Sequence, residues 1–330
     1  MSLVGALRNR APGAALLAMT AAAWLTTGLG PARAQEQRTI KLLIPFQAGG
    51  GSDILGRFLS DLISRTHGPT FVVENRPGAG TAIATEAAAR AEPDGNTVLI
   101  VGNSFVINPL LRKRNYDPLT SFEPLCLLTR SPNVVTVHSS SPHRTLPDLV
   151  NAVRAKPGEV TMAINGPFTS QQMAYEKLKR SANIDMVAVT FSGGAPSVNA
   201  LLGQHVAALV VNYPSAGEVI AAGNLRTLAI TALKRNPLVP DIPTVGELGY
   251  PEIDEDVWFG IVAPAKTPAP VVTQLADWFG AAVKAPELEP KLGKLGYSVV
   301  GACGQHFASF LKAQHEAYDQ IIREANIKGK

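Results

Sequence analysis

Residues 40–53 read IKLLIPFQAGGGSD, an apolar segment followed by three consecutive glycines and two residues that can cap a helix. Apolar residues recur beyond it at helical spacing, so the run predicts a strand, a glycine loop and an amphipathic helix that begins near Ser52 or Asp53. Because glycine has no Cβ, an anion can approach the amides of this loop at the helix N-terminus. An ordinary strand-to-helix turn is the alternative interpretation.

Nucleotide-binding loops do not fit this run. A dinucleotide fingerprint requires glycine where the chain has Ile54, and a phosphate loop requires lysine and a hydroxyl residue where it has Arg57 and Phe58. The anion predicted for the loop is therefore not a nucleotide phosphate.

Signatures of catalysis are also missing from the sequence. It contains no Gly-x-Ser-x-Gly, His-Glu-x-x-His or Cys-x-x-Cys pattern, and its 6 histidines are dispersed. Asp53 is the one carboxylate near the glycine loop, and a helix cap is its expected role rather than a general base. We therefore expect no enzyme activity, no metal and no cofactor.

Residues 1–34 are predicted to be a cleaved secretory signal peptide. Arg8 and Arg10 precede an apolar stretch, and small residues stand at the cleavage positions before Gln35. An uncleaved anchor is the alternative, but the stretch is shorter than the roughly 20 residues that span a bilayer. Without the leader the formal net charge of +4 falls to +1, because three arginines leave with it. We expect a periplasmic protein that does not bind nucleic acid.

Cys126 and Cys303 are the 2 cysteines of the chain. Export to an oxidising compartment permits a disulfide between them, which would tie the middle of the chain to its C-terminal region. Two free buried thiols are the alternative.

Strand-like and helical runs alternate along the chain, which predicts an α/β fold with two mostly parallel sheets. The expected strands are residues 40–46, 71–74, 98–101, 134–137, 160–164, 186–189, 206–211, 225–231 and 257–262. The expected helices are residues 52–65, 81–91, 146–155, 170–180, 196–202, a segment that ends at 222, 271–283 and 305–325. The last helices have no sheet of their own, so we expect residues 35–132 plus 257–330 to form one discontinuous lobe and residues 133–256 the other. Closure about a hinge would then trap a ligand between the lobes.

Five loops that follow predicted strands are small, uncharged and rich in hydrogen-bond donors: residues 47–52, 102–104, 165–171, 190–195 and 212–215. Ligands of open α/β sheets bind beyond the carboxyl ends of the strands. A carboxylate there would rest on backbone amides, hydroxyls and side-chain amides at helix N-termini. For any single loop, ordinary turn chemistry is the alternative.

Several strings, taken in order, cover nearly the whole mature chain. They are PFQAGGGSD at 45–53, ENRPGAGTAIATEAAARAEPDGNTVL at 74–99, NAVRAKPGEVTMA at 151–163, LLGQHVAALVVN at 201–212, LRTLAIT at 225–231, VPDIPTVGELGY at 239–250 and VWFGIVAPAKTP at 257–268. Together they closely resemble the substrate-binding proteins of tripartite tricarboxylate transporters, called the Bug family.

This resemblance implies a two-lobed receptor of the type II periplasmic binding-protein fold. Such a receptor captures a small organic carboxylate and delivers it to membrane permease subunits, and we expect it to be a monomer. By position, the ligand-contacting residues implied by the family are Phe46, Gln47, Ala48, Gly49, Gly50, Gly51, Ser52, Asn103, Ser104, Asn165, Gly166, Thr169, Ser170, Phe191, Ser192, Gly193, Gly194, Ala195 and Asn212. The glycine loop is expected to meet the ligand first, and closure then to bring in the loops at Asn165 and Phe191.

Two loops depart from the family's usual pattern. The fourth reads Phe191-Ser192-Gly193 where a tyrosine and a basic or polar residue are common, and the third carries Pro167-Phe168 in place of small polar residues. Both departures disfavour an amino-acid ligand and leave an aromatic or other less polar carboxylate open. A receptor that signals to a two-component sensor kinase, and an exported enzyme on the same fold, remain the alternatives to a transport receptor.

Overall fold

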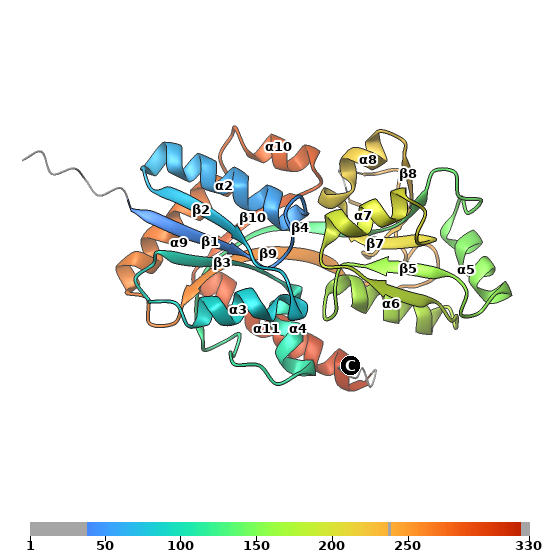
Figure 1. Ribbon diagram of the computed structural model, residues 1–330, viewed down its shortest axis with the longest axis horizontal. Coiled ribbons are helices and arrows are strands. Elements are labelled where there is room, and N and C mark those ends of the chain that lie inside the picture. Colours follow the sequence, from blue (N-terminus) through green and yellow to red (C-terminus); the bar gives the residue numbers. More distant parts are fainter. Residues whose placement is uncertain (1–37, 237–238, 325–330) are drawn as a thin grey trace, which may run out of the picture. The chain divides into compact units, whose positions relative to one another are not determined.

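The computed structural model describes residues 38–236 and 239–324, so the predicted signal peptide lies outside the described residues. The strands are β1 (Thr39–Ile44), β2 (Thr70–Asn75), β3 (Thr97–Gly102), β4 (Phe122–His138), β5 (Thr161–Ile164), β6 (Val187–Thr190), β7 (Ala208–Asn212), β8 (Leu225–Ile230), β9 (Asp256–Pro264) and β10 (Ser298–Cys303). The helices, drawn in Figure 1 with the strands, are α2 (Gly51–His67), α3 (Ala82–Ala89), α4 (Asn103–Leu111), α5 (Leu146–Ala155), α6 (Ser170–Ser181), α7 (Gly194–Leu202), α8 (Gly217–Ala221), α9 (Ala269–Val283), α10 (Glu289–Lys294) and α11 (Gln305–Glu324), with short 3₁₀ turns η1 (Ala79–Thr81) and η2 (Tyr213–Ser215).

Strand β4 joins two groups of strands. The hydrogen-bonded order is β2-β1-β3-β9-β4-β7-β5-β6, and β8 and β10 also pair with β4. From Phe122 to Pro132, β4 pairs with β9, and from Asn133 onward it pairs with β7 along one edge and, from Val134, with β8 along the other. The partner changes between Pro132 and Asn133, where the sequence analysis places a crossing between lobes. The division of the chain into two lobes remains a prediction.

The α/β class is confirmed, but the strand pairing is mixed. β2 and β3 are parallel to β1, and β6 and β7 are parallel to β5. Every pair formed by β4 is antiparallel, as is β3 with β9. The prediction of mostly parallel sheets is wrong at this centre, because β4 leaves the first group of strands and β9 returns to it in the opposite direction.

Three elements escaped the sequence analysis, and β4 begins far earlier than predicted. Pro124 and Pro132 lie inside β4 and made its first part look interrupted, since proline cannot donate to a strand ladder. Pro109 lies inside α4 and disguised that helix in the same way. The other two, α10 and β10, are only 6 residues long each.

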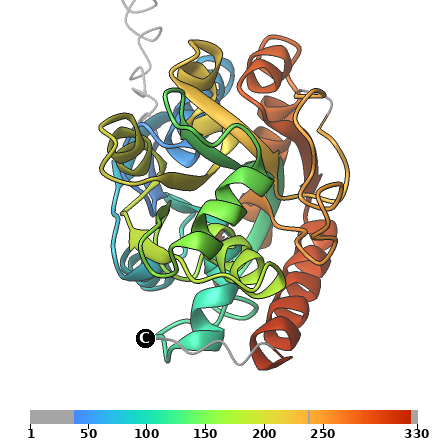
Figure 2. The same ribbon diagram turned by 90° about the vertical axis from the view of Figure 1, so that its right-hand side faces the viewer.

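Helices cover both faces of each group of strands. In the first group, α2, α9 and α10 pack on one face and α3, α4 and α11 on the other. In the second group, α5 and α6 pack on one face and α7 and α8 on the other. Figure 2 looks onto α5 and α6 (green), with α11 (red) to the right. None of the helices in the described part of the chain is long and apolar enough to cross a membrane.

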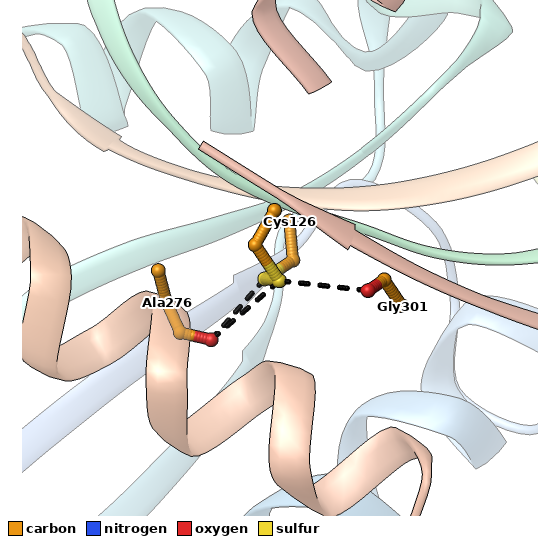
Figure 3. Close-up of a disulfide and its surroundings, with 4 residues drawn as sticks. Cys126, Ala276 and Gly301 are labelled. Carbon is orange, nitrogen blue, oxygen red and sulfur yellow. Dashed lines mark hydrogen bonds between the residues drawn. A yellow bond between two sulfur atoms is a disulfide. The ribbon is translucent and has the colours of Figure 1, made fainter. Parts of the chain in front are cut away.

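A disulfide fastens β10 to β4 (Figure 3). It joins Cys126 and Cys303, whose Cα atoms lie 3.9 Å apart across the antiparallel pair, and it closes a segment of 177 residues. The Sγ atom of Cys126 lies 3.2 Å from the carbonyl oxygen of Ala276 on α9. A Cβ on Gly280 of the same helix would lie 2.8 Å from Sγ of Cys303, so glycine lets α9 cover the bridge closely.

Candidate functional site

A small cavity of about 40 Å³ lies between the two groups of strands, where the loops after β1, β3, β5 and β7 meet. Helices α2, α4, α6 and α7 begin at residues that line it, namely Gly51, Asn103, Ser170 and Gly194. A helix N-terminus carries partial positive charge and free N–H groups. The lining residues, all without an ionisable side chain, are Phe46, Gly50, Gly51, Ser52, Gly102, Asn103, Ser104, Asn165, Thr169, Ser170, Gln171, Gly194, Asn212, Ser215, Val257 and Phe259.

A second, larger cavity of about 260 Å³ adjoins the first. Phe46, Asn165 and Thr169 line both cavities, so the two are neighbouring compartments of one cleft. The other residues that line the second cavity are Pro45, Gly78, Ala79, Gly80, Thr81, Gly166, Pro167, Thr190, Phe191 and Ser192.

The structure brings most residues of the predicted site into these two cavities. Phe46, Gly50, Gly51, Ser52, Asn103, Ser104, Asn165, Thr169, Ser170, Gly194 and Asn212 line the first. Gly166, Phe191 and Ser192 line the second. Five predicted residues line neither cavity: Gln47, Ala48, Gly49, Gly193 and Ala195. Gly49 and Ala195 instead lie against each other, since a Cβ on Gly49 would be 3.5 Å from Cβ of Ala195.

Sequence reasoning missed five residues of the first cavity. Gly102, Gln171 and Ser215 lie in or beside the predicted loops, so the loop pattern already pointed near them. Val257 and Phe259 stand two apart on β9 and therefore face the same side of the strand. Their apolar character gave no sign that this side is the wall of a cavity.

The glycine loop contributes fewer amides than its sequence suggests. The N–H of Gly49 donates to Oδ2 of Asp53 at 3.0 Å, and the N–H of Gly51 donates to Oγ of Ser215 at 2.9 Å. The N–H of Gly50 has no acceptor among the described residues. The predicted caps Ser52 and Asp53 lie inside α2, whose N-cap is Gly50, so the prediction of the helix start is wrong by one to two residues. A glycine at the cap leaves the helix end open to the cavity.

Asp53 stabilises the loop from behind the helix end. Burial raises the pKa of Asp53, but hydrogen bonds from Arg57, the Gly49 amide and Asn75 together outweigh it and hold that pKa below its ordinary value. The carboxylate is therefore charged at neutral pH and occupied by three donors, as expected of a residue that positions the loop.

Asn165 and Asn212 line the first cavity, and each side-chain oxygen lies within hydrogen-bond distance of a serine hydroxyl. Oδ1 of Asn212 accepts from Oγ of Ser215 at 2.9 Å, and Oδ1 of Asn165 accepts from Oγ of Ser197 at 2.7 Å. The bond from Ser215 orients the Asn212 amide and leaves its NH₂ group as the available donor, whereas the single hydroxyl proton of Ser197 also lies within reach of the carbonyl oxygen of Gly194, at 2.7 Å. Nδ2 of Asn212 is buried and has no hydrogen-bond partner. A buried donor without an acceptor is unfavourable, and a ligand oxygen at this point would satisfy it.

The side chain of Asn103, by contrast, makes its hydrogen bonds within the protein. Nδ2 donates to the backbone oxygen of Asp256 and to the hydroxyl of Tyr318, both at 3.0 Å, and Oδ1 accepts from the N–H of Trp258 at 3.3 Å. The side chain therefore anchors the start of α4 to β9 and α11. Asn103 borders the cavity but has no side-chain donor left for a ligand.

Asn133 on β4 holds two cavity residues, Ser170 and Gln171, and links them to the segment before β9. Nε2 of Gln171 donates to Oδ1 of Asn133 at 2.7 Å, and Nδ2 of Asn133 donates to Oγ of Ser170 and to the backbone oxygen of Glu255. Burial raises the pKa of Glu255, although Lys177 and Tyr318 oppose that rise.

Within the described residues, no group of three or more His, Cys, Asp and Glu side chains is placed to hold a metal ion.

The same architecture is found in solved structures that are 26–30% identical to this chain. The periplasmic binding protein BugD is 30% identical, with a TM-score of 0.85 over 88% of this chain and 99% of its own. Rpa4515 of R. palustris, solved with adipate, is 29% identical, with a TM-score of 0.85 over 89% of this chain and 99% of its own. MatC from Rhodopseudomonas palustris, solved with bound malate, is 26% identical, with a TM-score of 0.81 over 86% and 99%.

These similarities confirm the predicted binding-protein fold. The family model described as "Tripartite tricarboxylate transporter family receptor" matches residues 55–327, which is most of the described chain. The chain belongs to the tripartite tricarboxylate transporter receptor family.

Proposed function

We propose that this protein is a periplasmic receptor that binds the carboxylate group of a small organic acid in the first cavity and delivers the acid to a membrane permease. The observation that carries the proposal is the convergence of four helix N-termini on a cavity without charged side chains. A single carboxylate there would be held by dipoles and hydrogen bonds alone.

The available donors fit one carboxylate group. The NH₂ groups of Asn165 and Asn212 approach from the second group of strands, and the N–H of Gly50 approaches from the first. Each charge-assisted hydrogen bond of this kind contributes about 1.5–3 kcal/mol. The relatives solved with adipate and malate, both dicarboxylates, support a carboxylate as the ligand class.

The two-lobe organisation supports a capture mechanism. The donors come from both sides of the point where β4 changes partners between Pro132 and Asn133, so a ligand would join the lobes that residues 35–132 plus 257–330 and residues 133–256 are predicted to form. Closure would bring the donors together, and opening would release the ligand to the permease. The predicted leader at residues 1–34 supports the periplasmic location. A binding role without chemistry accounts for the uncharged cavity.

Isothermal titration calorimetry of the purified protein against a panel of organic acids tests this function. At 100 times its Kd, a ligand should also stabilise the protein against unfolding by about 2.7 kcal/mol. Asn212→Ala should weaken binding by roughly tenfold or more through the loss of one charge-assisted bond. Val187→Ala, at an exposed position on β6, is the matched control and should bind like the parent. A panel in which no carboxylate binds would overturn the proposal.

A further inference from the structure

The second cavity carries information about the rest of the ligand, provided that the proposed function holds. Pro45, Phe46, Pro167 and Phe191 give it apolar walls drawn from both groups of strands. It shares Phe46, Asn165 and Thr169 with the first cavity and is several times larger. A carboxylate held in the first cavity would therefore place the remainder of its molecule here.

No residue that lines the second cavity has an ionisable side chain. Two arginines follow α4, and both have other partners. The guanidinium of Arg112 lies 5.4 Å from the ring centre of Phe168, and Arg114 donates to Oδ1 of Asn108 at 2.8 Å and, at 3.4 Å, to the backbone oxygen of Ala79. Neither arginine lines the cavity. A second carboxylate there would lose its hydration and would gain neither a cation nor the four helix N-termini that line the first cavity.

We propose that the ligand is a monocarboxylate whose carboxylate binds in the first cavity and whose uncharged, largely apolar body fills the second. This assignment separates the chain's ligand from the dicarboxylates adipate and malate of its solved relatives. The walls set by Phe191 and Pro167 then select the shape of the body, and the donors of Asn165 and Asn212 select the carboxylate.

The competing occupant is a second carboxylate at the N-terminus of α3, which follows the cavity residues 78–81. In this helix the N–H of Ala82 already donates to the carbonyl of Ala79, and Oγ1 of Thr81, which is buried without a hydrogen-bond partner, is a single neutral donor. Its first residues thus offer less to an anion than the four helix ends at the first cavity. The two occupants predict opposite preferences between acids of equal chain length.

Calorimetry with matched acids decides between them. Hexanoate and adipate share a six-carbon chain, and 3-phenylpropanoate can be compared with its para-carboxy analogue. We expect the monocarboxylate of a pair to bind at least roughly tenfold more tightly than its dicarboxylate, because only the latter buries an unpaired charge. Equal or tighter binding of the dicarboxylates would overturn this inference and leave the proposed receptor function intact. Failure of all four acids, together with the wider panel, would overturn the function itself.

A new cation should narrow the preference for the monocarboxylate. Ser192 is exposed at the rim of the second cavity, so Ser192→Lys places an ammonium there without filling the core. We expect it to strengthen binding of adipate by roughly tenfold relative to binding of hexanoate. Asn199→Lys, on the exposed face of α7 and outside both cavities, is the control for added net charge. An equal gain for adipate in both variants would count against a body site at the second cavity.

Discussion

Nζ of Lys177 on α6 lies 2.7 Å from Oε1 of Glu255, and Glu255 is only 2% exposed. The carboxylate of Glu255 also accepts a hydrogen bond from the hydroxyl of Tyr318 on α11, and the backbone oxygen of Glu255 accepts hydrogen bonds from Asn133 and Thr231. α6 packs on the second group of strands and α11 on the first. One buried carboxylate thus fastens both groups at the segment where the chain returns through β9.

Lys177→Ala should strongly destabilise the protein, because it leaves Glu255 buried without its cation. Loss of one partner of a buried pair costs about 3–5 kcal/mol in the free energy of unfolding. Burial already raises the pKa of Glu255, and removal of Lys177 raises that pKa further, so the loss should be smaller at pH 5 than at pH 8. Urea unfolding at both pH values measures the effect.

Lys179→Ala on the same helix is the matched control. In its pair with Asp185 the carboxylate is exposed and the lysine side chain is partly exposed, so the change should cost under about 1 kcal/mol. Equal losses in the two variants would show that burial of Glu255 has no special role.

Asp256 should make stability fall as pH rises. Burial raises the pKa of Asp256 to about 6, while Arg130, at 3.7 Å, lowers it and Asp254 raises it. Because the unfolded carboxyl has a pKa of about 3.9, the folded state holds the proton more tightly, and the free energy of unfolding decreases between about pH 4 and pH 6. Asp256→Asn should remove this slope and be more stable than the parent at pH 8 by up to about 3 kcal/mol.

Thermal or urea unfolding of the parent and Asp256→Asn from pH 4 to pH 8 gives the difference curve, in which all other titrations cancel. Asp61→Asn, at an exposed position paired with Arg65, should leave the slope unchanged. A difference curve that is flat for Asp256→Asn would contradict the prediction.

Gly51→Ala should weaken ligand binding by displacing Asn212. A Cβ at Gly51 would lie 2.3 Å from Nδ2 of Asn212. The N–H of Gly51 also donates to Oγ of Ser215, and Ser215 in turn orients the side-chain amide of Asn212. We expect a loss of affinity of roughly tenfold or more, measured by calorimetry with an acid that the parent binds. Circular dichroism should show the folded spectrum.

Gly246→Ala is the control for this change, since a Cβ there meets its nearest neighbour at an ordinary 3.6 Å. It should bind like the parent. Unchanged affinity in Gly51→Ala would mean that Asn212 does not donate to the ligand.

The loops that form the site could be predicted from local sequence patterns. The apolar run before the three glycines gave β1 and α2, and the uncharged loops after successive strands gave the neighbourhoods of Asn165 and Asn212. These features depend on residues close in sequence, where strand and helix periods and turn chemistry operate.

The other features of the site and the fold could not be predicted, because they depend on contacts between residues far apart in the sequence. The residues next to Asn103 in the sequence do not indicate that its side chain bonds to Tyr318 and Asp256. Likewise, the glycine run does not indicate that the N–H of Gly49 donates to Asp53 rather than to a ligand. The first part of β4 could not be predicted either, because Pro124 disfavours a strand locally. That part of β4 is stabilised by pairing with β9 and β10, which lie far away in the sequence. Partners of this kind are set by topology.

Removal of the disulfide should weaken the fold and spare the ligand site. The bridge between Cys126 and Cys303 closes a segment of 177 residues, so its loss frees much of the unfolded chain. A disulfide typically contributes about 2–4 kcal/mol to the free energy of unfolding, and long loops lie at the upper end. Neither cysteine lines either cavity, so Cys126→Ala/Cys303→Ala should keep the parent's Kd for an acid while its urea midpoint falls. Thiol titration of the unfolded parent before and after reduction completes the test: reactive thiols before reduction, or an unchanged midpoint in the double variant, would contradict a stabilising bridge.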